Sequence, residues 1–251
     1  YPLRDIAFAL DMNSKGKYIT ILGEDHRLYN EQINAALLML EKKTRKPLYY
    51  SFVLLEEGKM STRKGTLVLL EDFMKQAEKK AGEGLQKRYK KIDKKAAKVI
   101  GYGALKYSIL RVSPEKNVTF NWDNALNFEG ETAPYIQYAY ARISSIIKKN
   151  KKAIQKNINF ELLNEKEEIE LIKKVALFPE IVEKTAKELR PNLMANYAYE
   201  LAKQFNEFYH MHNILKEEKQ LKDSRLALAA SVKQAIKNSL NLLGIDVLEK
   251  M

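Results

Sequence analysis

The hydrophobic spacing of this chain changes once, and the change separates two kinds of structure. Before residue 74, short β-branched runs alternate with helical spacing, so that residues 18–22 and 49–55 are expected to be strands and residues 30–42 a helix. After Gly82 and Gly84 the apolar residues recur almost wholly at helical spacing. The sequence therefore predicts a partial α/β domain followed by an all-α helical bundle, with a mostly helical chain overall.

Local signals predict where several helices begin and end. A helix is expected from residue 71 to about residue 80, and Thr132 is expected to cap a helix that runs to about residue 148. The last long helix is expected to start at Asp223 or Ser224 and to stop at Gly244. With only 10 Gly and 6 Pro in 251 residues, a turn-dense β architecture is not expected.

The charge of the chain is positive and unevenly placed. There are 44 Lys+Arg against 32 Asp+Glu, a net charge of +12, and residues 75–98 hold ten basic and three acidic residues. Such blocks fit a partner with a phosphate backbone, because neutralised phosphates release counterions. The alternative, that lysine-rich helices simply solvate their outer faces, stays open on charge alone.

Several classes of protein are excluded or disfavoured by what the composition lacks. With no cysteine there are no disulfides and no thiolate zinc sites, which suits a cytoplasmic protein. No apolar run approaches the roughly 20 residues of a membrane span, so no membrane partner is expected. His210 and His212, two apart on a helix, do not face one site, and no bound metal is predicted.

The most informative stretch is Lys59-Met60-Ser61-Thr62-Arg63-Lys64-Gly65, between two strand-like runs. Three cations and two hydroxyls within seven residues suit a loop that grips a polyphosphate and stabilises the charge of departing pyrophosphate. An ordinary exposed basic loop is the alternative that chemistry alone leaves open.

This loop resembles the signature loop of class I aminoacyl-tRNA synthetases, in the form typical of arginyl-tRNA synthetases. Four further stretches are similar to that family in the same order along the chain: Tyr1 to Ala7, Phe120 to Tyr138, Phe205 to His210, and Arg225 to Met251. The class I His-x-Gly-His motif is not present, because histidine occurs only at positions 26, 210 and 212. The chain thus resembles the C-terminal portion of the family, without its N-terminal domain and the first half of its catalytic domain.

The resemblance implies roles for single residues in the catalytic part. Lys59, Met60, Ser61, Arg63 and Lys64 would form the catalytic loop. Tyr1, Asp5 and His26 would bind arginine, although His26 stands where related enzymes often carry glutamine and is as readily a helix-capping or buried structural histidine. Gly23 and Asp25, in a Gly-x-Asp stretch after a strand, would bind ATP, since α/β sheets place ligand groups at the carboxyl ends of their strands.

In the helical half, the resemblance places Tyr138, Arg142, Tyr209 and Met251 near the anticodon loop of the tRNA. Tyrosine and arginine are the expected types, because unpaired bases are recognised by stacking and by hydrogen bonds to their edges. The alternative for each residue taken singly is a core position at helical spacing.

The resemblance also implies an organisation and an activity. Residues 1–74 would be the end of a Rossmann-like catalytic domain, residues 75–130 a helical connector that contacts the tRNA stem, and residues 131–251 the anticodon-binding domain. The activity would be arginine–tRNA ligation through an arginyl-adenylate, with L-arginine, ATP with Mg²⁺ and arginine tRNA as partners and a monomer as the expected state. The chain alone is expected to bind tRNA without completing activation.

Two rivals remain at this point. One is a non-catalytic RNA-binding protein that has kept a synthetase tail. The other is a different class I enzyme such as a cysteinyl-tRNA synthetase, whose substrate zinc site needs cysteine and which the chain's composition disfavours.

Overall fold

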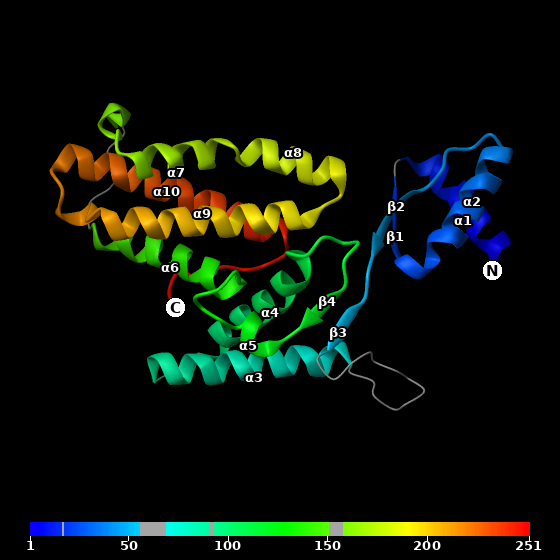
Figure 1. The fold of residues 1–251 in the computed structure, drawn as a ribbon, viewed down its shortest axis with the longest axis horizontal. Helices are drawn as coiled ribbons and strands as arrows, with labels where there is room; N and C mark the ends of the chain where they lie inside the picture. The colour runs from blue at the N-terminus through cyan, green and yellow to red at the C-terminus, as the bar shows by residue number, and fades with distance from the viewer. Residues whose placement is uncertain (17, 56–68, 91–92, 151–157) are drawn as a thin grey trace. The chain divides into compact units, whose positions relative to one another are not determined.

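The structure is a computed structural model, and it describes residues 1–16, 18–55, 69–90, 93–150 and 158–251. These residues form two compact units (Figure 1). The first unit is made of residues 1–54 and 112–119, and the second of residues 55–111 and 120–251. Each unit has its own core and is described by itself.

The first unit is a small α/β layer. Its helices are α1 (Pro2–Lys15) and α2 (Arg27–Met39), its strands are β1 (Ile19–Gly23) and β2 (Lys46–Tyr50), and a 3-10 turn, η1 (Glu24–His26), follows β1. β1 and β2 are parallel, with Ile19 opposite Lys46 and Gly23 opposite Tyr50, so that β1, α2 and β2 form a β-α-β crossover. Ala9, Ile33 and Leu37 are buried between α1 and α2.

The prediction of one strand over residues 49–55 is wrong, because the chain changes partners inside that run. β2 ends at Tyr50, and β3 (Val53–Leu55) pairs with β4 (Val118–Phe120) instead of with β1. The backbone N–H of Ser51 donates to the Pro114 carbonyl at 2.8 Å, and Phe52 accepts from Val118 at 2.9 Å. The apolar run is continuous in sequence, but its hydrogen bonds go to two different strands.

The second unit is a helical bundle (Figure 1). Its helices are α3 (Leu70–Tyr89), α4 (Lys94–Leu110), α5 (Trp122–Ala125), α6 (Ala133–Lys149), α7 (Lys166–Ala176), α8 (Phe178–Glu188), α9 (Pro191–Met211) and α10 (Lys219–Leu242), with the 3-10 turns η3 (Phe160–Leu162) and η4 (Ile214–Lys216). α9 lies at the centre and packs against α6, α7, α8 and α10. The predicted order, an α/β layer followed by a helical bundle, is confirmed.

Helix α3 is twice as long as the sequence indicated. It was expected to end near residue 80, yet it continues through Gly82 and Gly84 to Tyr89. Glycine costs a helix about 1 kcal/mol, but packing against α4 overrides that local preference. The approach is close: a Cβ at Gly101 of α4 would lie 2.5 Å from the Ala77 carbonyl oxygen of α3. Only glycine at this position allows the two backbones to meet.

The predicted helix ends are confirmed in part. Thr132 caps α6 by accepting from the Tyr135 N–H at 3.3 Å, and Gly244, with φ +67°, follows the end of α10. The predicted start of α10 is wrong, because the helix begins at Lys219. Asp223 and Ser224 are buried inside it, and the Ser224 hydroxyl donates to the Asn159 carbonyl at 2.8 Å rather than capping the helix.

Candidate nucleic-acid interface

A groove of about 320 Å³ opens on the bundle beside α6. Four separate segments line it: the end of α3, the outward face of α6, the last turns of α9, and the tail after α10. The lining residues are Tyr89, Tyr138, Ala141, Arg142, Ser145, Ile146, Lys149, Tyr209 and Met251. All four residues that the sequence associated with tRNA therefore lie in one groove of the second unit, although they come from three segments up to 113 positions apart in the chain, the span from residue 138 to residue 251.

Arg142 is at the centre of this groove. Its guanidinium carbon lies 4.7 Å from the ring centroid of Tyr138 and 5.1 Å from that of Tyr209. Its Nη1 donates to the Asn206 amide oxygen at 2.6 Å. Since an amide and two neutral rings hold the guanidinium, its positive charge is fixed in position and is not cancelled by these partners.

The tyrosines of the groove combine a supported ring with an accessible edge. Tyr209 stacks on Phe205 of the buried core, with ring centroids 6.2 Å apart and an interplanar angle of 22°, and it remains 37% exposed. Tyr89, the last residue of α3, is 39% exposed. Burial raises the pKa of Tyr89 above its ordinary value, and the neighbouring Tyr138 raises it further, so its hydroxyl stays protonated and neutral at physiological pH.

The helical pattern of α6 explains why Tyr138 and Arg142 face the groove. Residues four apart share a helix face, and the opposite face of α6 is taken up by Ile136, Tyr140 and Ile143, each at most 2% exposed. Tyr138 and Arg142 are therefore left on the side that the core does not use. This split agrees with the spacing in the sequence.

The electrostatics of the groove favour an anionic, aromatic ligand. Arg142 and Lys149 supply two cations, and none of the described residues that line the groove carries a carboxylate side chain. Arg88 adds a third cation nearby, since its guanidinium lies 4.9 Å from the Phe128 ring and 5.9 Å from the Tyr138 ring. Aromatic faces beside fixed cations are the combination that binds an unpaired nucleotide.

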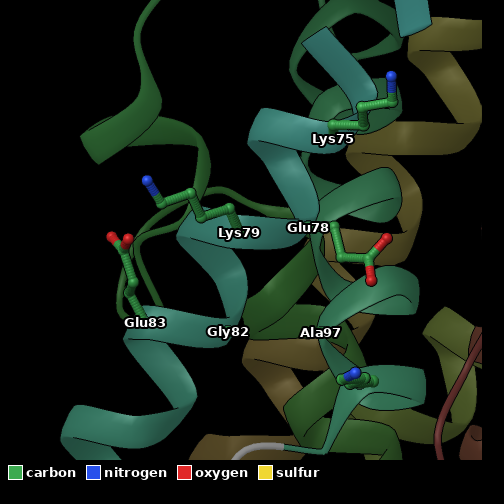
Figure 2. Close-up of a pocket in the computed structure, with 7 residues that line it drawn as sticks. Lys75, Glu78, Lys79, Gly82, Glu83 and Ala97 are labelled. Carbon is green, nitrogen blue, oxygen red and sulfur yellow. The ribbon is translucent and has the colours of Figure 1, made fainter. Parts of the chain in front are cut away.

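A second hollow, of about 490 Å³, is larger but chemically plainer (Figure 2). It lies on α3 and α4 and is lined by Lys75, Glu78, Lys79, Gly82, Glu83, Lys94 and Ala97. Figure 2 shows its long side chains spread over the helices rather than converging on one point. Its three lysines are partly balanced by two glutamates, and its described lining has no aromatic ring on which a base could stack. The smaller groove is therefore the better candidate for a nucleotide site.

The residues associated with ATP and arginine lie in the first unit. Gly23 ends β1, and Asp25 follows it in η1, which places both at the carboxyl end of a parallel strand. A Cβ on Gly23 would lie 2.4 Å from the Asp25 carboxylate as it is placed here, so a larger residue would require that exposed side chain to move. His26 is exposed at the start of α2 and its side chain makes no capping hydrogen bond, so neither a buried nor a helix-capping role describes it.

Asp5 has a partner that the sequence did not indicate. The Tyr29 hydroxyl, on α2, donates to one Asp5 carboxylate oxygen at 2.8 Å, and this bond raises the pKa of Tyr29 above its ordinary value. Tyr1 is 99% exposed and is joined to Asp5 by the backbone bond of the first helical turn, at 3.1 Å. Tyr29 carries no motif of its own, and the contact depends on the packing of α1 against α2.

The signature-loop residues Lys59, Met60, Ser61, Arg63 and Lys64 lie outside the described residues. Within the described ranges, no group of three or more His, Cys, Asp or Glu side chains is placed to hold a metal ion. No described helix is long and apolar enough to cross a bilayer.

Comparisons with known proteins match one part of the bundle to a domain family and the whole chain to curated relatives. Residues 136–251 match the family model of the DALR anticodon binding domain. The arginine–tRNA ligase of Methanocella arvoryzae is 42% identical over 257 residues, covering 100% of this chain and 45% of that protein. The arginine–tRNA ligase of Methanocaldococcus jannaschii is 42% identical over 252 residues, covering 98% of this chain and 44% of that protein.

Solved structures agree. The arginyl-tRNA synthetase of Thermus thermophilus superposes with a TM-score of 0.84 at 28% identity, over 94% of this chain and 41% of that one. The chain thus spans less than half the length of the relatives it matches, as expected from the resemblance to one portion of the family. These matches favour the arginyl family over the alternative of a cysteinyl-tRNA synthetase. From its sequence, its fold and its anticodon binding domain, the chain belongs to the arginyl-tRNA synthetase family.

Proposed function

We propose that the chain is the tRNA-recognition half of an arginine–tRNA ligase, and that the groove beside α6 binds an unpaired nucleotide of the anticodon loop of arginine tRNA. The observation that carries this proposal is the convergence of Tyr138, Arg142, Tyr209 and Met251 on one groove within the region that matches an anticodon binding domain. A core role would have placed these side chains on different buried faces.

The geometry supports a division of labour within the groove. Tyr209, supported from the core by Phe205, offers a ring on which a base can stack. Arg142, held between two rings and an amide, offers a flat guanidinium for a base edge or a phosphate. Lys149, on the next turns of α6, adds charge for the backbone.

The catalytic assignments are part of the same proposal. Lys59, Met60, Ser61, Arg63 and Lys64 would grip the pyrophosphate of ATP, and Mg²⁺ would arrive on the phosphates rather than in a protein cage. No side chain need act as a nucleophile, because the arginine carboxylate itself attacks the α-phosphate and the tRNA ribose then attacks the adenylate. The protein's part is to orient the reactants and to stabilise charge.

Gly23 and Asp25 would hold the adenosine end of ATP, and Tyr1, Asp5 and His26 the arginine. Tyr29 binds one oxygen of the Asp5 carboxylate, which leaves the other for a guanidinium. The setting that we propose is the cytoplasm, with one copy of the chain for each tRNA and no membrane partner.

The proposal is tested by binding the chain to an arginine tRNA anticodon stem–loop and to the same stem with a foreign loop, across a salt series. Preference for the native loop is expected to persist at high salt, because stacking and edge contacts are less screened than phosphate contacts. Equal, steeply salt-dependent binding to both RNAs would mean that the chain recognises phosphates only.

Matched variants sharpen this test. Tyr209→Ala is expected to weaken binding of the native loop about 5- to 150-fold, the equivalent of the 1–3 kcal/mol of one base stacked on an aromatic ring. Tyr199→Ala is the control, because Tyr199 lies on the same helix but packs against Tyr135, with ring centroids 5.4 Å apart, and does not line the groove. Equal losses from both variants would point to the fold of α9 rather than to the groove.

The arginine assignment has its own test, in a ligase that contains this chain. Asp5→Asn is expected to lower arginine-dependent exchange of pyrophosphate into ATP strongly, since a neutral amide lacks the negative charge that an ion pair with a guanidinium needs. Asp11→Asn, on the same helix but ion-paired with Lys15 at 2.6 Å, is expected to leave the exchange unchanged.

A further inference from the structure

The tail that follows α10 is tied to the bundle at several points along its length. The Lys106 ammonium donates to the Gly244 carbonyl, and the Gln137 amide donates to the Asp246 carbonyl at 2.8 Å. Ile245 is buried in the main core, at 1% exposure. The tail is therefore a packed part of the second unit up to this point.

The last anchor is a carboxylate held from two helices. Glu249 Oε1 accepts from the Tyr140 hydroxyl of α6 at 2.7 Å, and Oε2 accepts from the Lys233 ammonium of α10 at 2.8 Å. Lys233 also lies 4.9 Å from the Tyr140 ring centroid, so the three side chains form one cluster. The Lys233 bond, and after it the Tyr140 bond, lower the pKa of Glu249 to about 2, which keeps the carboxylate charged at neutral pH.

Met251 stands two residues beyond this cluster. Leu248 and Met251 pack against a small apolar cluster of α3 and α4 that includes Leu85 and Ile100, and Met251 also lines the groove beside Arg142 and Tyr209. Two residues reach at most about 7 Å, so the position of Glu249 limits where Met251 can lie. Without that anchor, the last residues would be held only by the apolar contacts of Leu248 and Met251, and Leu248 does not line the groove.

We propose that Glu249, fixed by Tyr140 and Lys233, is a positioning residue that holds Met251 as one wall of the nucleotide groove. The inference rests on the proposed function of that groove. Its physical content is preorganisation: a wall already in place does not have to be ordered when the ligand binds. Glu249 itself is not among the residues that line the groove.

The test is a double-mutant cycle on the whole 251-residue chain, with the arginine tRNA anticodon stem–loop as the probe. Glu249→Ala is expected to weaken binding about three- to tenfold, the cost of ordering a side chain on binding. In a Met251→Ala background, Glu249→Ala is expected to have no further effect, because there is no wall left to position. Glu249→Gln, which keeps an acceptor for Tyr140, is expected to restore part of the affinity and guards against a variant that folds poorly.

Lys250→Ala is the matched control, since Lys250 is an exposed neighbour on the same tail, and its affinity is expected to equal that of the unaltered chain. Equal losses from Glu249→Ala in both backgrounds would overturn the inference, because a purely structural or electrostatic role does not depend on Met251. Unchanged binding by Glu249→Ala beside weakened binding by Tyr209→Ala would overturn the positioning role and leave the groove intact. Unchanged binding by both would overturn the groove and the inference together.

Discussion

Replacement of Arg142 by lysine separates the two things that this side chain offers, its charge and its shape. Lysine keeps the positive charge, but its ammonium is not planar and cannot hold the fork geometry of a guanidinium. In the structure the guanidinium carbon lies 4.7 Å from the Tyr138 centroid and 5.1 Å from the Tyr209 centroid, and the group is fixed by a 2.6 Å hydrogen bond to Asn206. Arg142→Lys removes all three geometric constraints while leaving the net charge of +12 unchanged.

The size of the effect follows from what is lost. Each stacking contact of a guanidinium with a ring contributes about 0.5–1 kcal/mol at a partly exposed site, and one stacked base contributes about 1–3 kcal/mol to binding. We expect Arg142→Lys to weaken the native anticodon stem–loop by about 1–2 kcal/mol, which is about 5- to 30-fold in Kd. The slope of log K against log salt is expected to stay the same, because the number of cations is the same.

Arg142→Met completes the comparison. It loses the same geometry and a cation as well, so its binding is expected to fall at least as far and its salt slope to shrink by about 0.7 for a contact to single-stranded RNA. Fluorescence anisotropy at four or five salt concentrations measures both quantities. If Arg142→Lys binds like the unaltered chain while Arg142→Met does not, Arg142 is a phosphate contact only, and the reasoning from its planar stacking is refuted.

Three further predictions concern the scaffold that holds the groove. Arg225→Met is expected to lower the free energy of unfolding in urea by about 3–5 kcal/mol. In the unaltered chain the Arg225 Nε bonds to the fully buried Glu168 carboxylate at 2.6 Å, and the variant leaves that buried charge without its partner. Adding Glu168→Leu, which removes the buried charge, is expected to restore most of the lost stability. Gly101→Ala is expected to cost about 1–3 kcal/mol in the same assay, since its Cβ would lie 2.5 Å from a carbonyl oxygen of α3, and an unchanged midpoint would contradict the close packing. The bond to Lys233 lowers the pKa of Glu249, so its stabilising effect is complete above about pH 4.5 and is lost as the pH falls toward about 2. Glu249→Gln is expected to remove this pH dependence of the free energy of unfolding, which amounts to less than about 1 kcal/mol because solvent largely screens the pair. A variant whose thermal stability falls with acid in the same way as that of the unaltered chain would count against the pair.

The fold was predictable where local chemistry and tertiary packing agree. The change from alternating strands to helices, the Thr132 cap and the Gly244 stop all depend on neighbours in sequence, and all three are found in the structure. The errors arise where a distant segment decides. Helix α3 runs through Gly82 and Gly84 because α4 packs against it, and the residue 49–55 run breaks because β4 takes over the pairing. The residues of α3 and of the 49–55 run do not by themselves indicate which distant segment will pack or pair with them.

Prediction of the groove from the sequence was limited in the same way as prediction of the fold. Helical spacing was enough to put Tyr138 and Arg142 on one face, and the family resemblance was enough to name Tyr209 and Met251, but neither could say that the four line one space. Tyr89 was missed because it ends a helix that was expected to stop some nine residues earlier, so its ring had no predicted place. The side chains of the groove are therefore held by residues, such as Phe205 and Asn206, to which the sequence assigned no role of their own. A sequence pattern can identify which side chains touch a ligand. The residues that fix the geometry of those side chains act through packing and hydrogen bonds, and these contacts form only once the chain has folded.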